Sequence, residues 1–214
     1  MSILDDMRQS VIDGDMNSTQ ELVQKALAEK IPPEQILRDG LISAMAEVGR
    51  RFECAEFYVP EMLISARAMK SGLALLRPHL AAANIQAIGK VVIGTVKGDL
   101  HDIGKNLVGM MLEGAGFEVI DLGNDVSPDK FMASIIDHQP DILAMSALLT
   151  TTMLDMKTTI DVIKANSLRD RVKIIIGGAP VTEDYARQIG ADGYSPDASR
   201  AASFAKSMMD ISIE

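Results

Sequence analysis

The chain has 214 residues, a formal net charge of −9 and a single cysteine, Cys54. This length suits one large or two small domains, and one cysteine excludes both a disulfide framework and a cysteine-rich metal site, which favours a reducing cytoplasm. The acidic balance offers no basic face to nucleic acid, and no apolar run approaches the length of a membrane span, so we expect neither kind of partner.

From residue 3 to about residue 80, apolar residues recur at helical spacing and no strand pattern interrupts them. Asn17 or Ser18 can cap one helix. Pro33 starts another, which continues to Phe52 with apolar residues three and four positions apart. A third apolar run follows from Pro60. We therefore expect residues 1–83 to form a helical cap domain, an antiparallel four-helix bundle.

Strands and helices alternate in the second half of the chain, after a boundary at residues 81–89 that carries neither pattern. The expected strands are residues 91–96, 117–122, 141–149 (a strand with its following turn), 172–176 and 193–194, and each is followed by a helical segment. Strict alternation implies a doubly wound α/β domain with a parallel sheet and right-handed crossovers. Five strands suit a flavodoxin-like, Rossmann-like order, and we place this domain at residues 90–214.

One turn of the second domain carries unusual chemistry. It lies between the carboxyl end of the first strand and the start of a helix, where open α/β sheets bind ligands. Asp99 can accept a hydrogen bond from one ring nitrogen of His101, which makes the other nitrogen a better metal donor. Gly104 has no Cβ and lets a bulky group approach the helix start. An aspartate two residues before a histidine is common, so this spacing alone leaves a purely structural role open.

Two further strand ends should meet the same edge of the sheet. Ser146 ends the third strand and begins a run of small and hydroxyl side chains that reaches Thr150. Gly177 and Gly178 end the fourth strand with no side chains. Taken singly, each has an ordinary alternative, a satisfied hydroxyl or a strand-to-helix turn. Together they predict a slot beside the histidine.

The three motifs, in order, are Asp99-x-His101-x-x-Gly104, Ser146-x-Leu148 and Gly177-Gly178. This combination resembles the cobalamin-binding domain of corrinoid methyltransferase proteins, and the helical half resembles the cap bundle of the same proteins. The similarity is closest to the free-standing corrinoid proteins of the methanol, methylamine, glycine betaine and aryl methyl ether (O-demethylase) systems. It extends to the cobalamin module of methionine synthase and covers nearly the whole chain.

The resemblance implies a cobalamin or related corrinoid, bound base-off with His101 as the lower ligand of cobalt. Asp99 would orient His101, and Ser146 would close the hydrogen-bonded chain behind Asp99. The displaced nucleotide tail would enter the slot. The residues expected to line that slot are Gly104, Leu148, Thr150, Gly177 and Gly178. Asp102 and Ile103 adjoin the histidine, and Met62 of the helical half would shield the reactive face of cobalt as part of a movable lid.

A methyl carrier is the function that the resemblance implies. Such a protein accepts methyl on Co(I) from a substrate-specific methyltransferase and passes it from methyl-Co(III) to a second methyltransferase that serves tetrahydrofolate or a thiol. A reductive activating protein is a further expected partner, and the chain alone is expected to be non-catalytic.

Three alternative functions have requirements of their own. A cobalamin sensor or regulatory module would need a DNA-binding domain. The cobalamin subunit of a mutase would need a partner barrel and an adenosyl ligand. A phospho-acceptor domain would need an acidic cluster at the first strand end.

Overall fold

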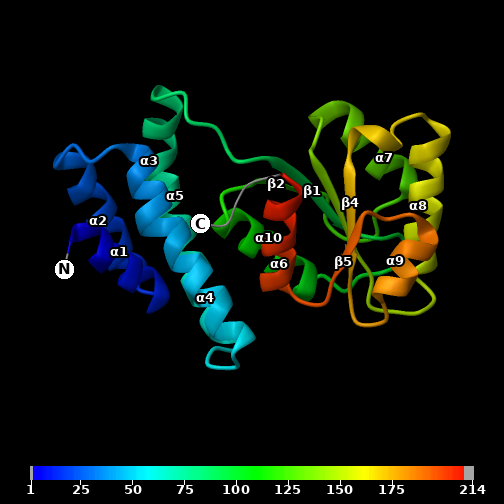
Figure 1. Ribbon diagram of the computed structural model, residues 1–214, viewed down its shortest axis with the longest axis horizontal. Helices are drawn as coiled ribbons and strands as arrows, with labels where there is room; N and C mark the ends of the chain where they lie inside the picture. Colours follow the sequence, from blue (N-terminus) through cyan, green and yellow to red (C-terminus); the bar gives the residue numbers. More distant parts are fainter. Residues whose placement is uncertain (1, 210–214) are drawn as a thin grey trace. The chain divides into compact units, whose positions relative to one another are not determined.

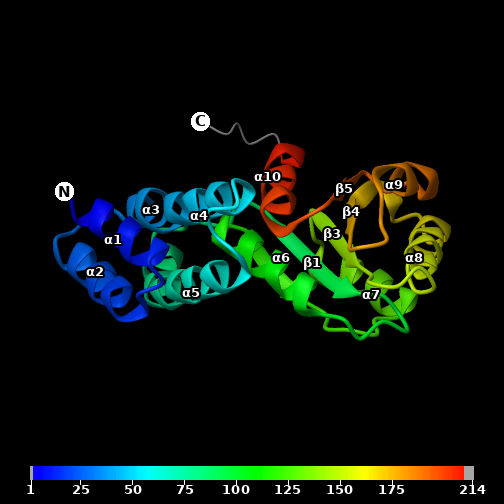
Figure 2. The same cartoon turned by 90° about the horizontal axis from the view of Figure 1, so that it is seen from below.

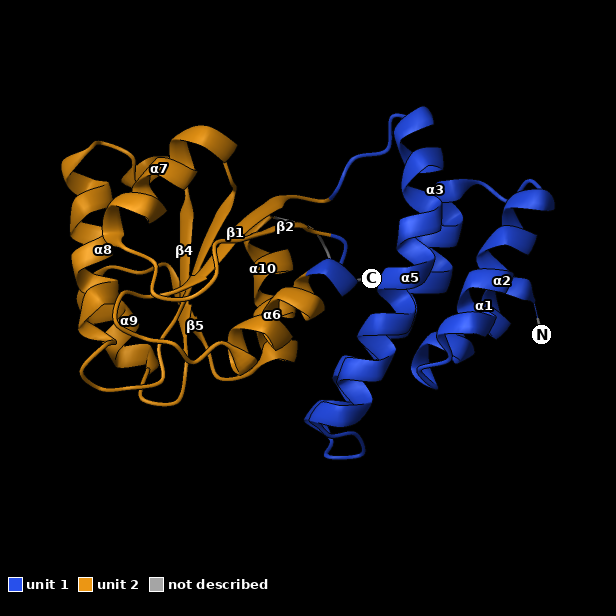
Figure 3. Ribbon diagram, turned by 180° about the vertical axis from the view of Figure 1, so that it is seen from behind, with its two compact units in different colours: residues 1–87, 113–116 blue, residues 88–112, 117–214 orange. Residues whose placement is uncertain are grey.

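The computed structural model of the chain describes residues 2–209. It divides into two compact units, which are shown in different colours in Figure 3. One unit consists of residues 1–87 and 113–116, and the other of residues 88–112 and 117–214. No helix in the described part of the chain is long and apolar enough to cross a membrane.

The first unit is helical (Figure 1). Its main helices are α1 (Ile3–Ile12), α2 (Met16–Ala28), α4 (Ser43–Glu53) and α5 (Val59–Ala82). A short α3 (Pro33–Gln35) runs into a π-helical stretch, η1 (Ile36–Ile42), which leads directly into α4. One continuous helix was expected from Pro33 to Phe52. The π-helical stretch inside it escapes sequence analysis because apolar residues four apart suit both helix types.

Local capping explains where these helices begin. Ser2 and Asp5 form a capping box at the start of α1. Asp15 caps α2 by accepting a hydrogen bond from the Ser18 backbone N–H at 3.0 Å. The expectation that Asn17 or Ser18 caps this helix is therefore wrong, because the carboxylate of Asp15 reaches the free N–H groups one turn earlier.

The second unit is a parallel sheet covered on both faces. Its strands are β1 (Lys90–Thr95), β2 (Glu118–Asp121), β3 (Ile142–Ser146), β4 (Lys173–Gly177) and β5 (Gly193–Ser195). They are hydrogen-bonded in the order β2-β1-β3-β4-β5, with every pairing parallel. This is the flavodoxin-like order, and the expected fold class is confirmed.

The helices of this unit are α6 (Ile103–Gly114), α7 (Pro128–His138), α8 (Leu154–Ala165), α9 (Glu183–Ile189) and α10 (Ala198–Met208), with a 3-10 turn, η2 (Arg169–Arg171), before β4. Helices α6 and α10 cover one face of the sheet, and α7, α8 and α9 cover the other (Figures 1 and 2). Right-handed crossovers require this division, since the chain passes to opposite sides as the strand order reverses around β1.

Burial on both faces explains why the strands read as continuous apolar runs. In β1, Val91, Val92 and Ile93 are all buried. Leu143 of β3 pairs with Val92, Ile174 of β4 pairs with Leu143, and neither has exposed surface. Helix α7 contributes Phe131 to the same core. The sheet is thus a rigid platform whose carboxyl edge carries the loops.

Candidate functional site

The register of the sheet brings the three predicted strand ends into one row. Thr95 at the end of β1 pairs with Ser146 of β3, Ser146 pairs with Gly177 of β4, and Gly177 pairs with Ser195 of β5. Every residue in this row is small. The carboxyl edge of the sheet therefore carries only small side chains in this row, at the place where α/β proteins bind their ligands.

The turn after β1 is organised around the carboxylate of Asp99, which is fully buried. Its Oδ1 accepts hydrogen bonds from the His101 backbone N–H at 3.0 Å and from the His101 ring Nδ1 at 2.8 Å. Its Oδ2 accepts from the Leu148 backbone N–H at 2.8 Å and from Thr152 Oγ1 at 2.6 Å. The carboxylate thus joins the loop after β1 to the loop after β3.

These contacts determine the charge state of Asp99. Burial by itself raises the pKa of the carboxyl, because it removes water from the ionised form. The four donated hydrogen bonds outweigh burial and hold that pKa well below its usual range. Asp99 is therefore a permanent anion at neutral pH.

His101 is oriented by this anion. With Nδ1 directed at Asp99 Oδ1, the other ring nitrogen, Nε2, is the one left for a metal ion. The His101 side chain is 50% exposed, and the hydroxyl of Thr95 donates to its backbone oxygen at 3.2 Å. The expected hydrogen bond between Asp99 and the histidine ring is confirmed, and the arrangement leaves Nε2 of the ring at the carboxyl edge of the sheet.

The hydroxyl behind Asp99 belongs to Thr152 rather than to Ser146. The Thr152 side chain is buried and also lies 3.1 Å from the backbone oxygen of Leu149. Ser146 was expected to close the hydrogen-bonded chain, and this expectation is wrong because both carboxylate oxygens are taken up by other donors. The missed signal lay in the run Thr150-Thr151-Thr152, where a third hydroxyl follows the two nearer to the strand.

The start of α6 is open and apolar. A Cβ built on Gly104 would meet no atom within 4 Å, as expected if the missing side chain admits a bulky group. Ile103 is 78% exposed and Leu100 is 68% exposed, although both are large apolar side chains. Asp102 between them is half-buried, and its backbone oxygen accepts the Asn106 N–H at 2.8 Å. Apolar side chains left in solvent around a metal donor suit a flat apolar ligand.

The loop after β3 lies beside this surface. Leu148 is 44% exposed and Thr150 is exposed, while Ser146 at the strand end is half-buried. The Leu148 backbone is fixed by its hydrogen bond to Asp99. Met62, also expected at the site, lies in α5 of the other unit and is fully buried.

Gly177 ends β4 and Gly178 follows it, and both have the structural role that the sequence left open. Gly178 has a φ of +124°, and a Cβ built on it would lie 1.9 Å from the backbone oxygen of Ala147. A Cβ on Gly177 would lie 3.0 Å from the backbone oxygen of Ser195. We expected the missing side chains to leave a slot, but backbone oxygens of Ala147 and Ser195 occupy the space that a Cβ at either position would enter.

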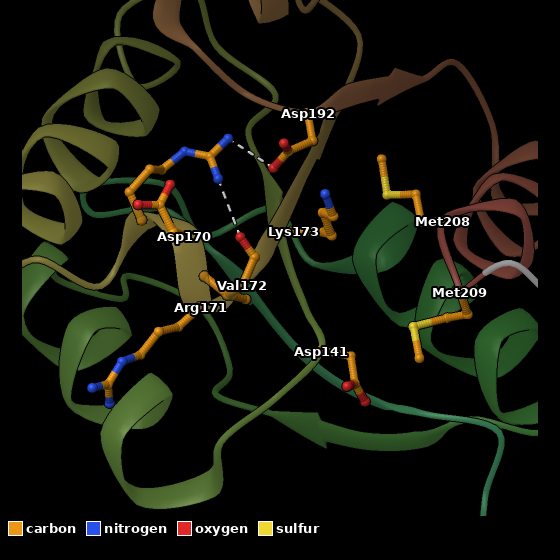
Figure 4. Close-up of a pocket in the computed structure, with 9 residues that line it drawn as sticks. Asp141, Asp170, Arg171, Val172, Lys173, Asp192, Met208 and Met209 are labelled. Carbon is orange, nitrogen blue, oxygen red and sulfur yellow. Dashed lines mark hydrogen bonds and ion pairs between the residues drawn. The ribbon is translucent and has the colours of Figure 1, made fainter.

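A cavity of about 540 Å³ lies at the opposite, amino edge of the sheet (Figure 4). Asp141 before β3, Lys173 at the start of β4 and Asp192 before β5 line it. Arg169 donates from Nη2 to Asp192 Oδ2 at 2.7 Å across one side. The lining is a balanced set of charges, and none of the predicted site residues belongs to it.

Comparison with known proteins adds a family to this geometry. Residues 89–203 match a family model described as a B12 binding domain, and residues 3–77 match a second model with the same description. A corrinoid protein of Desulfitobacterium hafniense strain Y51 is 41% identical over 212 residues, with 98% of each chain covered. Dimethylamine corrinoid protein 3 of Methanosarcina acetivorans is 41% identical over 207 residues, with 97% of each chain covered.

A solved structure agrees with these relatives. The crystal structure of the methanol:cobalamin methyltransferase complex from Methanosarcina barkeri contains a chain that matches with a TM-score of 0.88 and 28% identity. The match covers 98% of this chain and 80% of that chain.

Proposed function

The chain belongs to the B12-binding corrinoid proteins of methyltransferase systems, and from this premise we propose that it carries a methyl group on a bound corrinoid between two methyltransferases. The observation that carries the proposal is the Asp99–His101 pair at the carboxyl edge of the sheet. It presents one imidazole nitrogen beside an open helix start and exposed apolar side chains.

The residues present fit a corrinoid. His101 Nε2 is the atom that would coordinate cobalt, in place of the cofactor's own base. Ile103 and Leu100 offer apolar surface to the corrin ring, and the vacant side-chain position of Gly104 lets the ring approach the helix. Ser146, Leu148 and Thr150, on the loop after β3, would line the space for the nucleotide tail.

A bound corrinoid supplies a cobalt ion that can accept a methyl group and release it again. The protein's own contribution is electrostatic and positional. Asp99 holds the His101 ring in one tautomer and orientation, and its fixed negative charge raises the donor strength of Nε2. The hydrogen bond from Thr152 would keep the Asp99 carboxylate in place while the charge at the His101 imidazole changes.

The partners follow from the same proposal. A substrate-specific methyltransferase delivers the methyl group, a second methyltransferase removes it, and a reductive activating protein restores the cofactor after oxidation. Support comes from the relatives, since one is named for dimethylamine and the matched crystal structure is that of a methanol:cobalamin methyltransferase complex.

Ligation by His101 can be tested with cob(II)alamin and protein labelled with nitrogen-15 histidine. The electron paramagnetic resonance spectrum of the complex should show superhyperfine coupling to a nitrogen-15 nucleus, because the coordinating atom comes from the protein. His101→Ala should lose this coupling in a protein that still folds, although its unfolding temperature should fall because the buried Asp99 carboxylate loses one of its four donors. Coupling to nitrogen-14 in the labelled wild-type protein would show that the ligand is not a histidine and would refute His101 ligation.

A further inference from the structure

Lys105 is a buried cation at a position that electrostatics disfavours. It lies in the first turn of α6, where the positive end of the helix dipole repels a cation, and its side chain is only 1% exposed. Burial removes the hydration of an ammonium group, which is unfavourable unless hydrogen bonds replace the water. A lysine retained against both effects indicates a role other than solubility or helix stability.

The ammonium group of Lys105 connects the helix start to a neighbouring strand. Nζ donates to Asn106 Oδ1 at 2.6 Å and to Asp121 Oδ2 at 2.5 Å. Asp121 is the last residue of β2, and its other oxygen accepts the Gly123 backbone N–H at 2.8 Å. One carboxylate therefore joins α6 on one side to the loop after β2 on the other.

The loop after β2, residues 122–126, also holds the turn that precedes His101. The Gly98 backbone N–H donates to Asp125 Oδ1 at 2.7 Å. The Asp125 backbone N–H donates to the backbone oxygen of Asp99 at 3.0 Å. The chain is thus fastened to the same neighbouring segment both before and after the histidine.

We propose that Lys105, acting through Asp121, is a positioning residue for His101. The ion pair holds the first turn of α6 against the end of β2, and this sets where the imidazole and the open position at Gly104 stand with respect to the corrinoid. The inference rests on the proposed function, because it concerns the same cofactor. Partners that support a metal ligand without touching the metal typically change metal affinity by about 10- to 100-fold when they are removed.

Lys105→Met tests the proposal, since it keeps the length of the side chain and removes its charge. We expect cob(II)alamin to bind about tenfold more weakly, and the nitrogen-15 histidine coupling to be reduced. Asp121→Asn should have an effect of the same kind, because the single amide oxygen cannot accept from both Nζ and the Gly123 N–H and the negative charge opposite Lys105 is lost. The double variant should bind no more weakly than Lys105→Met alone, because the two residues act as one unit.

Arg169→Met is the matched control. Arg169 and Asp192 form a partly buried ion pair of 2.7 Å at the opposite edge of the same sheet. This variant should lower the unfolding temperature of the apoprotein and leave both the cob(II)alamin dissociation constant and the histidine coupling unchanged.

Wild-type affinity and coupling in a folded Lys105→Met protein would overturn the proposal. A loss of affinity in Arg169→Met that matches its loss of thermal stability would overturn it as well, because general destabilisation would then explain both variants. If Lys105→Met does not fold, Asp121→Asn decides by the same two readouts. A wild-type protein that fails to bind cob(II)alamin would instead refute the proposed function, so the two failures are distinguishable.

Discussion

Gly178→Ala probes whether the end of β4 must be glycine for the sake of the backbone alone. The built Cβ lies 1.9 Å from the oxygen and 2.9 Å from the carbonyl carbon of Ala147. No flexible side chain is available to move aside, so the backbone of one strand end has to shift. A residue forced into a region that only glycine occupies costs on the order of 1–3 kcal/mol. With the backbone shift added, we expect the free energy of unfolding to fall by about 3 kcal/mol.

The assay is urea unfolding of the apoprotein, followed by circular dichroism and extrapolated to water. Gly104→Ala is the matched control, because its built Cβ meets no atom within 4 Å and its position is helical. Alanine there should leave the free energy of unfolding unchanged or raise it by up to about 1 kcal/mol. The same variant should weaken cob(II)alamin binding, since the new methyl group stands where the ring approaches.

Gly178→Ala therefore tests a requirement of folding, and Gly104→Ala tests a requirement of cofactor binding. An unchanged urea midpoint for Gly178→Ala would refute the argument that backbone contact requires this glycine. Equal destabilisation by Gly104→Ala, or cob(II)alamin affinity equal to that of the wild type, would refute the assignment of open space at the helix start to the cofactor.

Two further predictions concern the buried carboxylate. Because the pKa of Asp99 is lowered in the folded protein, its ionised form stabilises the fold fully above the ordinary carboxyl pKa, and this stabilisation is lost as the pH falls below that value. Urea unfolding at a series of pH values should therefore show the stability gap between wild type and Asp99→Asn closing on acidification, and a constant gap would contradict the argument. Thr152→Val should lower the free energy of unfolding by about 1.5–3 kcal/mol, because the anion loses a donor, whereas Thr152→Ser should keep most of it. No loss of stability in Thr152→Val, or a larger loss in Thr152→Ser than in Thr152→Val, would refute the stabilising role of the hydroxyl.

The sheet could be predicted because strands buried on both faces consist of continuous apolar residues, which are visible in the sequence. The first strand was expected at residues 91–96 and lies at Lys90–Thr95, since a strand covered on both faces needs apolar, often β-branched residues throughout. Once the strands are taken as parallel, their carboxyl ends meet at one edge. The row through Ser146 and Gly177 follows from topology with no knowledge of side-chain contacts.

The details of the site depend on distances between atoms in the folded protein, and the spacing of residues along the sequence does not determine these distances. Three consecutive threonines offer equivalent hydroxyls, and only the path of the turn brings Thr152 to Asp99. The need for glycine at position 178 arises from Ala147, a residue distant in sequence. The sequence places Lys105 at the positive end of a helix, which is unusual for a cation and could have been noticed. Its partner Asp121 on β2 belongs to no sequence motif and could not have been predicted.

The saturation of the Asp99 carboxylate has a consequence for any change of charge at the imidazole beside it. A carboxylate with one donor can turn, and its turning contributes to the reorganisation energy of each charge transfer. Asp99 is held by donors from two loops and has no such freedom. Its field is already in place before the charge on the ring changes, which is the preorganisation that speeds reactions in which charge develops.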